Sequence, residues 1–263
     1  MVSRESEEMI LYKKAGAIAI LTINRPEHRN ALVFPMLRET GRILAAVAED
    51  TDVRVLILTG AGSSFCPGAD IQDKASGPGD PDRRSKPEDF RVPVLLHQMP
   101  AITIAAINGA CAGAGMGWAA ACDFRYAVPS AKFNTAFLDV GVAGDMGMPW
   151  TLPRIIGAGR ARELLFMPRK FDAEEAYRIG LVSGIFPEEA FTNEVLKIAE
   201  RISKIAPLAL RAMKSNFIEA EEMGLRSYIA LETARHLPMF ATYDTQEAFT
   251  AKLEKREPRF LGR

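Results

Sequence analysis

The chain has 263 residues, of which 48% are hydrophobic and 25% are charged, a composition typical of a globular protein with one substantial core. Lysine and arginine together number 33, as do aspartate and glutamate, so the formal net charge is zero. This balance argues against a nucleic-acid partner and against electrostatic binding to a membrane surface.

Strands and helices alternate through the first part of the chain. Residues 17–24 alternate in hydropathy and predict a strand, and residues 35–50 carry apolar side chains at helical spacing behind Pro35, which suits a first helical turn. Residues 53–59 form a nearly continuous apolar run, as buried parallel strands do. Residues 74–91 are polar, with prolines and glycines, and predict a surface loop that could cover a site.

The most informative segment is residues 101–122, which carry no charge. A strand over residues 103–108 is followed by four glycines at the place where a helix should begin: Gly109, Gly113, Gly115 and Gly117. Because the glycines and Asn108 interrupt the run, we interpret it as strand, turn and helix, and reject a membrane span. The unpaired N–H groups of such a helix start attract negative charge, so this turn is a candidate site for an oxyanion.

Helices dominate the rest of the chain. A short strand is predicted over residues 124–128, and a helix begins with the capping-box-like residues 172–175 and ends at Gly180. Four amphipathic helices are expected after it: residues 188–204, 207–220, 225–242 and 245–255. The chain is therefore predicted to have an α/β core over residues 1–200 and a helical region over residues 201–263.

Targeting and redox features are few. The segment MVSRESEEMILY has no apolar stretch of the kind found in secretory signals. Three cysteines, Cys66, Cys111 and Cys122, lack CxxC spacing and fit buried thiols in a reducing compartment. We therefore expect a cytoplasmic protein without disulfides.

Motifs for common cofactors do not match. Residues 113–118 read GAGMGW and lack the third glycine of a dinucleotide-binding fingerprint. The chain has neither GxxxxGK[ST] nor GxSxG. Its three histidines, His28, His97 and His236, show no metal-ligand spacing. We therefore predict neither a nucleotide cofactor nor a metal.

A second glycine-bearing turn follows another buried strand. Residues 63–71 read SSFCPGADI and come shortly after the strand predicted at 53–59. Two strand–turn–helix corners of one parallel sheet can direct their N–H groups to one point. Two such donors on one carbonyl oxygen form an oxyanion hole, in which each donor is worth about a hundredfold or more in rate. The spacing alone equally allows two ordinary loop corners.

The residues of these turns resemble those of a known family. SSFCPGADI, AAINGACAGAG at residues 105–115, GLVSGIFP at 180–187, NRPEHRNAL at 24–32 and PRFLGR at 258–263 are similar, in order and spacing, to motifs of the enoyl-CoA hydratase/isomerase family, the crotonases. The resemblance implies a spiral of ββα repeats, a C-terminal helical trimerisation region that also covers the active site, and a homotrimer or a dimer of trimers. It implies an acyl-CoA thioester substrate, so that coenzyme A enters as part of the substrate and no separate cofactor is expected.

The resemblance also assigns site residues. The thioester oxygen would be held by the N–H groups of Ala69 and Ala114. His28 and Arg29 would meet the CoA phosphates, although Arg29 also fits a solvated surface side chain. Lys252, on the last helix, would reach the CoA of a neighbouring subunit. The residues expected to contact substrate are His28, Arg29, Ala31, Asp70, Ile71, Gln72, Gly113, Gly115, Trp118, Phe137 and Lys252.

The resemblance implies a role in substrate binding for several of these residues. Residues 69–72 would line the path of the pantetheine arm. Gly113 and Gly115 would allow the substrate to approach the backbone closely. Trp118 and Phe137 would contribute to an apolar acyl pocket. Asp70, beside one donor, also fits a residue that braces its loop.

The acid–base residues depart from the pattern of the family's hydratases. These enzymes use two glutamates, and the matching positions are occupied by Gly117 and Phe137, neither of which carries a proton. Asp145 resembles the aspartate used by dienoyl-CoA isomerases and related branches. A single carboxylate in an apolar pocket can take a proton from one carbon and return it to another, so double-bond isomerisation is the simplest chemistry. Asp145 also fits a cap for a helix over residues 146–156.

Other functions remain open at this point. One is hydration of an unusual enoyl-CoA, with Asp145 as the sole acid–base group. Dehalogenation would use Asp145 as a nucleophile and needs a histidine base, but Phe90 stands at the matching position and His97 lies nearby in sequence. Retro-Claisen hydrolysis would also need a base for water. A non-catalytic acyl-CoA-binding subunit would have kept the fold and lost the acids.

Overall fold

The computed structural model describes residues 8–71 and 85–263, and the structural statements below concern these residues. Its main sheet has six strands in the order β1-β2-β3-β5-β7-β10. Their bounds are Ile10–Ala15, Ile18–Ile23, Val55–Gly60, Ile102–Ile107, Phe124–Ala127 and Gly184–Ile185. β1 and β2 form an antiparallel hairpin, and every other pair of neighbours is parallel.

A second, smaller sheet lies beside the first, in the order β4-β6-β8-β9. Its strands are Ser64–Cys66, Ala110–Ala112, Lys132–Asn134 and Phe171–Asp172. β4, β6 and β8 follow β3, β5 and β7 along the chain, so each successive repeat adds one strand to each sheet. This is the expected spiral of ββα repeats, and it stacks the turns after β4 and β6 next to one another.

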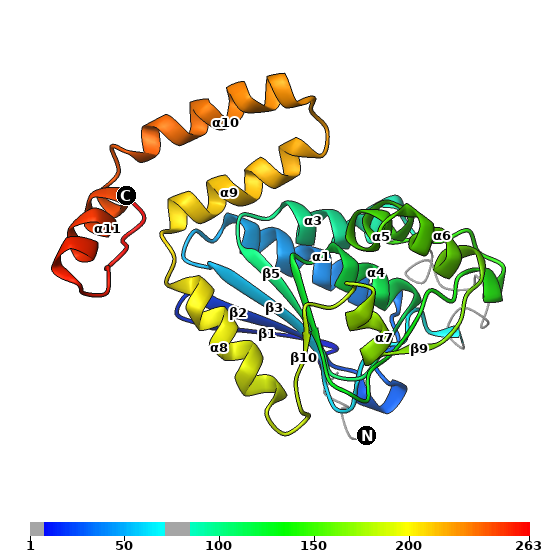
Figure 1. Ribbon diagram of the computed structural model, residues 1–263. Helices are drawn as coiled ribbons and strands as arrows, with labels where there is room; N and C mark the ends of the chain where they lie inside the picture. Colours follow the sequence, from blue (N-terminus) through cyan, green and yellow to red (C-terminus); the bar gives the residue numbers. More distant parts are fainter. Residues whose placement is uncertain (1–7, 72–84) are drawn as a thin grey trace.

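The main sheet is covered on both faces, which is why β3 and β5 are almost continuously apolar. Figure 1 shows α8 on one face and α1, α3 and α4 on the other. The helices of this part are α1 Phe34–Glu49, α3 Val92–Gln98, α4 Gly113–Ala121, α5 Met148–Ile156, α6 Ala158–Phe166, α7 Ala173–Arg178 and α8 Phe191–Ser203. Short 3₁₀ turns η1, η3 and η4 cover Pro26–His28, Pro87–Arg91 and Leu138–Val140.

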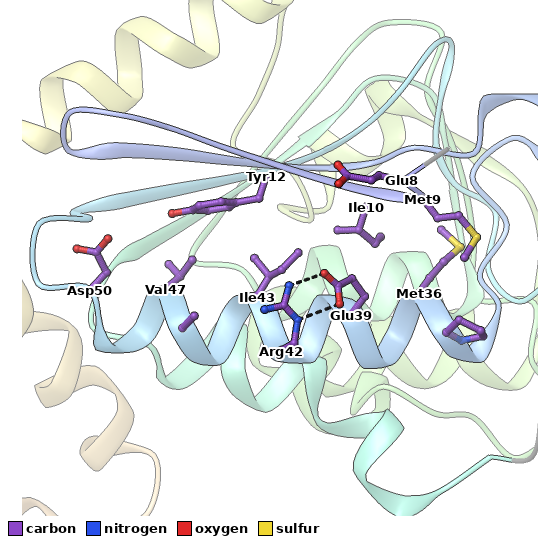
Figure 2. A pocket seen from close by; sticks show the side chains of 12 residues that line it. Glu8, Met9, Ile10, Tyr12, Met36, Glu39, Arg42, Ile43, Val47 and Asp50 are labelled. Atoms are coloured by element: carbon purple, nitrogen blue, oxygen red, sulfur yellow. Dashed lines mark hydrogen bonds and ion pairs between the residues drawn. The ribbon is translucent and has the colours of Figure 1, made fainter. Parts of the chain in front are cut away.

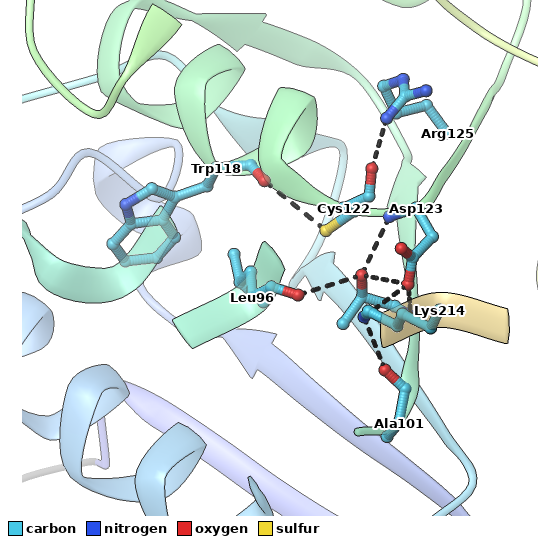
Figure 3. Close-up of polar contacts among 8 residues, drawn as sticks. Leu96, Ala101, Trp118, Cys122, Asp123, Arg125 and Lys214 are labelled. Carbon is cyan, nitrogen blue, oxygen red and sulfur yellow. Dashed lines mark hydrogen bonds and ion pairs between the residues drawn. The ribbon is translucent and has the colours of Figure 1, made fainter. Parts of the chain in front are cut away.

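Three further helices extend away from this core (Figure 1). They are α9 Pro207–Ala220, α10 Leu225–Met239 and α11 Tyr243–Glu254. The buried Lys214 joins α9 to the core: its Nζ donates to Asp123 Oδ2 at 2.7 Å and to the Ala101 carbonyl at 2.8 Å (Figure 3). The backbone N–H and hydroxyl of Thr103 donate to the same carboxylate oxygen, at 2.7 and 3.0 Å. This network fixes the start of the helical region against the sheet.

The alternation of strands and helices is confirmed, with differences at specific places. Sequence reasoning missed β1, most of which is exposed, and the short helices α3 and α6. The helix expected from residue 146 begins at Met148 with Gly147 as its N-cap, so Asp145 is not the capping residue. Of the loop expected at 74–91, the part up to residue 84 lies outside the described residues, and Pro87–Arg91 forms η3. No helix within the described residues is both long and apolar enough to cross a bilayer.

Candidate active site

The two glycine-bearing turns meet because the strands before them are neighbours. β4 and β6 pair in parallel, with Cys66 opposite Cys111. Beyond them, Gly68 adopts φ +106°, and a Cβ at this position would lie 3.2 Å from the Ala112 carbonyl oxygen and 3.5 Å from the Ala114 nitrogen. A side chain at residue 68 would therefore hold the two turns apart, and glycine allows them to converge.

The Ala69 amide is oriented by a backbone bridge to Leu32. Leu32 N–H donates to the Gly68 carbonyl at 2.8 Å, and Asp70 N–H donates to the Leu32 carbonyl at 2.9 Å. Successive peptide groups of an extended segment point to opposite sides, so the Ala69 N–H is directed away from Leu32. The Asp70 carboxylate accepts a hydrogen bond from Arg25 Nη1 at 2.6 Å, which braces this segment.

The Ala114 amide belongs to the first turn of α4. The strand β6 runs directly into this helix through Gly113, at φ +48°, and its N-cap residue Ala112 makes no side-chain capping hydrogen bond. The first N–H groups of a helix have no acceptor within the helix, and the helix dipole gives them a partial positive charge. Ala114 is therefore placed to donate to an oxyanion beside Ala69.

Gly115 packs closely against β4. A Cβ at this position would lie 2.3 Å from the Cys66 carbonyl oxygen and 2.7 Å from Cys66 Sγ. Glycine is thus needed at residue 115 for α4 to pack on β4. Burial raises the pKa of the Cys66 thiol to about 12, so this thiol is a packing group and not a nucleophile at neutral pH.

A single narrow pocket brings together Ala69, Ala114 and Asp145. Its other lining residues are apolar: Leu32, Val33, Phe34, Leu37, Phe90 and Met146. The space open to the centre of a water molecule is about 20 Å³, enough for about one water. Asp145 is the one ionisable side chain among the described residues that line the pocket.

Asp145 lies in the turn that connects η4 to α5. Its carbonyl accepts a hydrogen bond from the Met148 N–H at 3.3 Å, and its Oδ1 atom is buried. The carboxylate therefore shares an apolar, confined space with both candidate donors.

Gly117 and Phe137 occupy the two positions that carry glutamate in the family's hydratases. A Cβ at Gly117 would lie 2.5 Å from the Met146 Cβ. Phe137 is buried, and its ring lies 4.0 Å from the place where a Gly113 Cβ would be. Phe137 and Met146 thus pack beside α4, and Asp145 is the carboxylate among the described residues that line the pocket.

The remaining predicted residues lie at various distances from the pocket. His28 and Arg29 are exposed on the η1 turn, where Arg29 has φ +55°. Ala31 is half-buried, and its carbonyl accepts from Arg25 Nη1 at 3.1 Å. Ile71 is 68% exposed, two residues after Ala69. These side chains are accessible at the surface near one candidate donor.

Two other predicted residues do not line the pocket. Trp118 is fully buried and does not line it. Lys252 is exposed on α11, in the helical region that extends from the core (Figure 1). Gln72 lies outside the described residues.

Sequence reasoning missed the residue that supports the first turn. Asn30, at φ +65°, is fully buried; its Nδ2 donates to the Ser64 and Ala61 carbonyls at 2.6 and 2.9 Å, and its Oδ1 accepts from the Arg25 N–H at 2.9 Å. An asparagine inside a polar segment such as RPEHRNAL is an ordinary turn signal. The only sequence clue was its position within a family-like motif, because the two carbonyls to which it donates are more than thirty residues away.

A larger groove is lined by different residues. Figure 2 shows a groove of about 520 Å³ between the β1–β2 hairpin and α1, where Arg42 and Glu39 form an ion pair at 2.6 Å. That pair is largely exposed and links two residues of one helix face. Within residues 8–71 and 85–263, no group of three histidine, cysteine, aspartate or glutamate side chains is arranged to hold a metal ion.

The spiral of ββα repeats and its C-terminal helices define the crotonase fold, and comparison with known proteins agrees. A sequence profile described as "Enoyl-CoA hydratase/isomerase" matches residues 13–263. The chain therefore belongs to the enoyl-CoA hydratase/isomerase family.

Individual relatives cover the whole chain. The chain is 36% identical to a crotonyl-CoA hydratase of Syntrophomonas wolfei, over 97% of this chain and 99% of that protein. It is 33% identical to a peroxisomal Δ(3,5)-Δ(2,4)-dienoyl-CoA isomerase of Arabidopsis thaliana, over 99% and 98%. A crystal structure of an enoyl-CoA hydratase from Bacillus anthracis superposes with a TM-score of 0.90 at 31% identity, over 97% and 100% of the two chains. Relatives of both activities are thus about equally similar.

Proposed function

We propose that this protein is an acyl-CoA double-bond isomerase. The Ala69 and Ala114 N–H groups hold the thioester oxygen, and coenzyme A is present only as part of the substrate. The observation that carries the proposal is the shared pocket: one carboxylate, Asp145, lies with both donors, while Gly117 and Phe137 occupy the places of a hydratase's acids.

The proposed reaction moves one proton. Asp145 takes a proton from the α-carbon of a 3-enoyl-CoA, and the electrons pass to the thioester oxygen as a dienolate. The two N–H groups stabilise the negative charge that develops there. Asp145 then returns the proton to the γ-carbon, giving a 2-enoyl-CoA. No water or redox partner is consumed, and the apolar walls keep competing water away from the dienolate.

Replacement of the carboxylate tests this proposal. Asp145→Asn keeps the size of the side chain and removes the base, so we expect conversion of 3-hexenoyl-CoA to 2-hexenoyl-CoA to fall by at least about a hundredfold. Asp139→Asn is the matched control, because Asp139 is exposed on η4 in the same connection. The binding of saturated hexanoyl-CoA should stay within about threefold in both variants. Undiminished turnover by Asp145→Asn would refute the role.

Hydration is the second candidate, favoured by the similarity to the crotonyl-CoA hydratase. In that reaction Asp145 would both deprotonate water and protonate the α-carbon. Loss of the conjugated absorbance of crotonyl-CoA, at a rate above that of the isomerisation, would favour hydration. Acyl-CoA binding without either reaction would favour a binding subunit.

Dehalogenation and retro-Claisen hydrolysis receive less support. His97, the nearest histidine in sequence to the family's base position, lies on α3 and contacts Glu221 at 3.1 Å and the Trp150 ring. Among the described residues, no histidine and no other second base lines the pocket.

The helical region is proposed to join subunits. Residues 201–263 place large apolar side chains on their surface, including Phe217, Leu225, Leu237 and Leu253. We propose that a homotrimer, or a dimer of trimers, covers them, with residues 1–200 carrying the reaction. In such an assembly Lys252 would meet the CoA of a neighbour.

A further inference from the structure

Met146 is the buried residue of an otherwise open turn. Its neighbours Gly144 and Gly147 have φ +104° and +69°, and Met146 itself adopts φ +51°, a left-handed conformation that side chains other than glycine seldom take. Its residue is only 4% exposed, whereas Gly147 is exposed. A strained residue persists only where its surroundings hold it in place, so the neighbours of Met146 must maintain this conformation.

Met146 packs against Gly117 of α4. A Cβ at Gly117 would lie 2.5 Å from the Met146 Cβ and 3.1 Å from the Met146 carbonyl oxygen. Met146 thus fills the space that any side chain at residue 117 would take. Gly117 lies less than one turn after Ala114 on the same helix, so this contact joins the turn of Asp145 to the helix that bears one candidate donor.

We propose that Met146 is a positioning residue, which sets the place of Asp145 relative to the Ala114 N–H by packing on Gly117. The inference rests on the proposed function of Asp145. Two flanking glycines allow the turn many conformations, and the buried Met146 side chain selects one. The same contact leaves no room for an acidic side chain at residue 117.

Gly117→Ala tests the contact with one added methyl group. Since its Cβ cannot coexist with Met146 where it now lies, the turn must shift and move Asp145. A misplacement of about 1 Å can lower a rate about a hundredfold. We expect kcat for 3-hexenoyl-CoA isomerisation to fall by at least tenfold, with the dissociation constant of hexanoyl-CoA within threefold. Gly159→Ala on α6 is the control, because its Cβ would meet no atom within 4 Å.

Met146→Gly and the double variant separate this contact from general damage. Met146→Gly keeps a residue that accepts positive φ and removes the anchor, so kcat should fall about tenfold while thermal unfolding stays cooperative. In Gly117→Ala/Met146→Gly the clashing Cβ atom is gone, and we expect the kcat of Met146→Gly alone. Multiplicative losses in the double variant, or wild-type kcat in Met146→Gly, would overturn the inference.

The outcomes also separate the two proposals. If Asp145→Asn retained activity, the proposed function itself would be refuted. Activity lost in Asp145→Asn but retained in both Gly117→Ala and Met146→Gly would leave that function intact and reject the positioning role. Should Gly117→Ala fail to fold, Met146→Gly still decides, because it adds no atom. Deuterium uptake from D₂O into the α- and γ-carbons of the same substrate gives a second measure of proton transfer.

Discussion

Two helices of this protein differ in how far their residues are buried. All nine residues of α4, Gly113–Ala121, are buried, whereas none of the residues of α10, Leu225–Met239, is buried. α4 is rich in glycine and alanine, so strand and turn backbones can approach it closely. α10 instead presents Leu225, Ile229 and Leu237 at its surface.

The contrast distinguishes packing within the chain from apolar surface that the chain leaves exposed. The contacts of α4 with β4 and with Met146 lie within one chain, and the candidate site is built on them. The helical region leaves apolar surface that this chain does not cover, and such surface marks an interaction site. A single subunit therefore holds the donors and the carboxylate, while the helical region is expected to need another copy.

The largest effect on stability is expected where α4 packs most closely on β4. In Gly115→Ala the new Cβ would lie 2.3 Å from the Cys66 carbonyl oxygen, so α4 and β4 must separate. We expect the free energy of unfolding to fall by about 3 kcal/mol or more. Urea unfolding of this variant beside Gly159→Ala measures it. Equal stability of the two variants would contradict the close packing of α4.

An intermediate effect is expected at the joint between the two regions. Lys214→Met removes the hydrogen bonds from Lys214 Nζ to Asp123 and Ala101 and leaves a carboxylate without its cation (Figure 3). We expect a loss of about 2 kcal/mol in the free energy of unfolding. Lys204→Met, at an exposed lysine, is the control and should change stability by less than about 0.5 kcal/mol. Similar losses in both would show that the joint lies elsewhere.

The smallest effect is expected on the surface of the helical region. Leu253 is 85% exposed, and its burial by another subunit would contribute about 1.5 kcal/mol or more. Leu253→Asp should therefore weaken self-association by about tenfold or more, without lowering the stability of the isolated subunit. Sedimentation velocity over a dilution series measures it, with Thr250→Asp on the same helix as a control for the added charge. A chain that is monomeric before mutation would reject the proposed assembly.

Local sequence patterns predicted much of the main architecture. The apolar runs of β3 and β5, and the glycines after β5, each involve only a few neighbouring residues. The hydrophobic period and the turn residues therefore predict them from the sequence. The family-like motifs identified both donor positions and Asp145 as candidates. The pattern could not show that Gly115 faces Cys66, because that contact joins segments about fifty residues apart.

The amino-acid sequence by itself determined the fold class, the family and the absence of glutamate at positions 117 and 137, because these follow from residue identity and short-range order. Only the tertiary structure decided that Asp145 shares a pocket with Ala69 and Ala114, and that it does not cap α5. It also decided that Met146 fills the space beside Gly117. Such contacts depend on how distant backbone segments pack in three dimensions, which the spacing of residues along the chain does not specify.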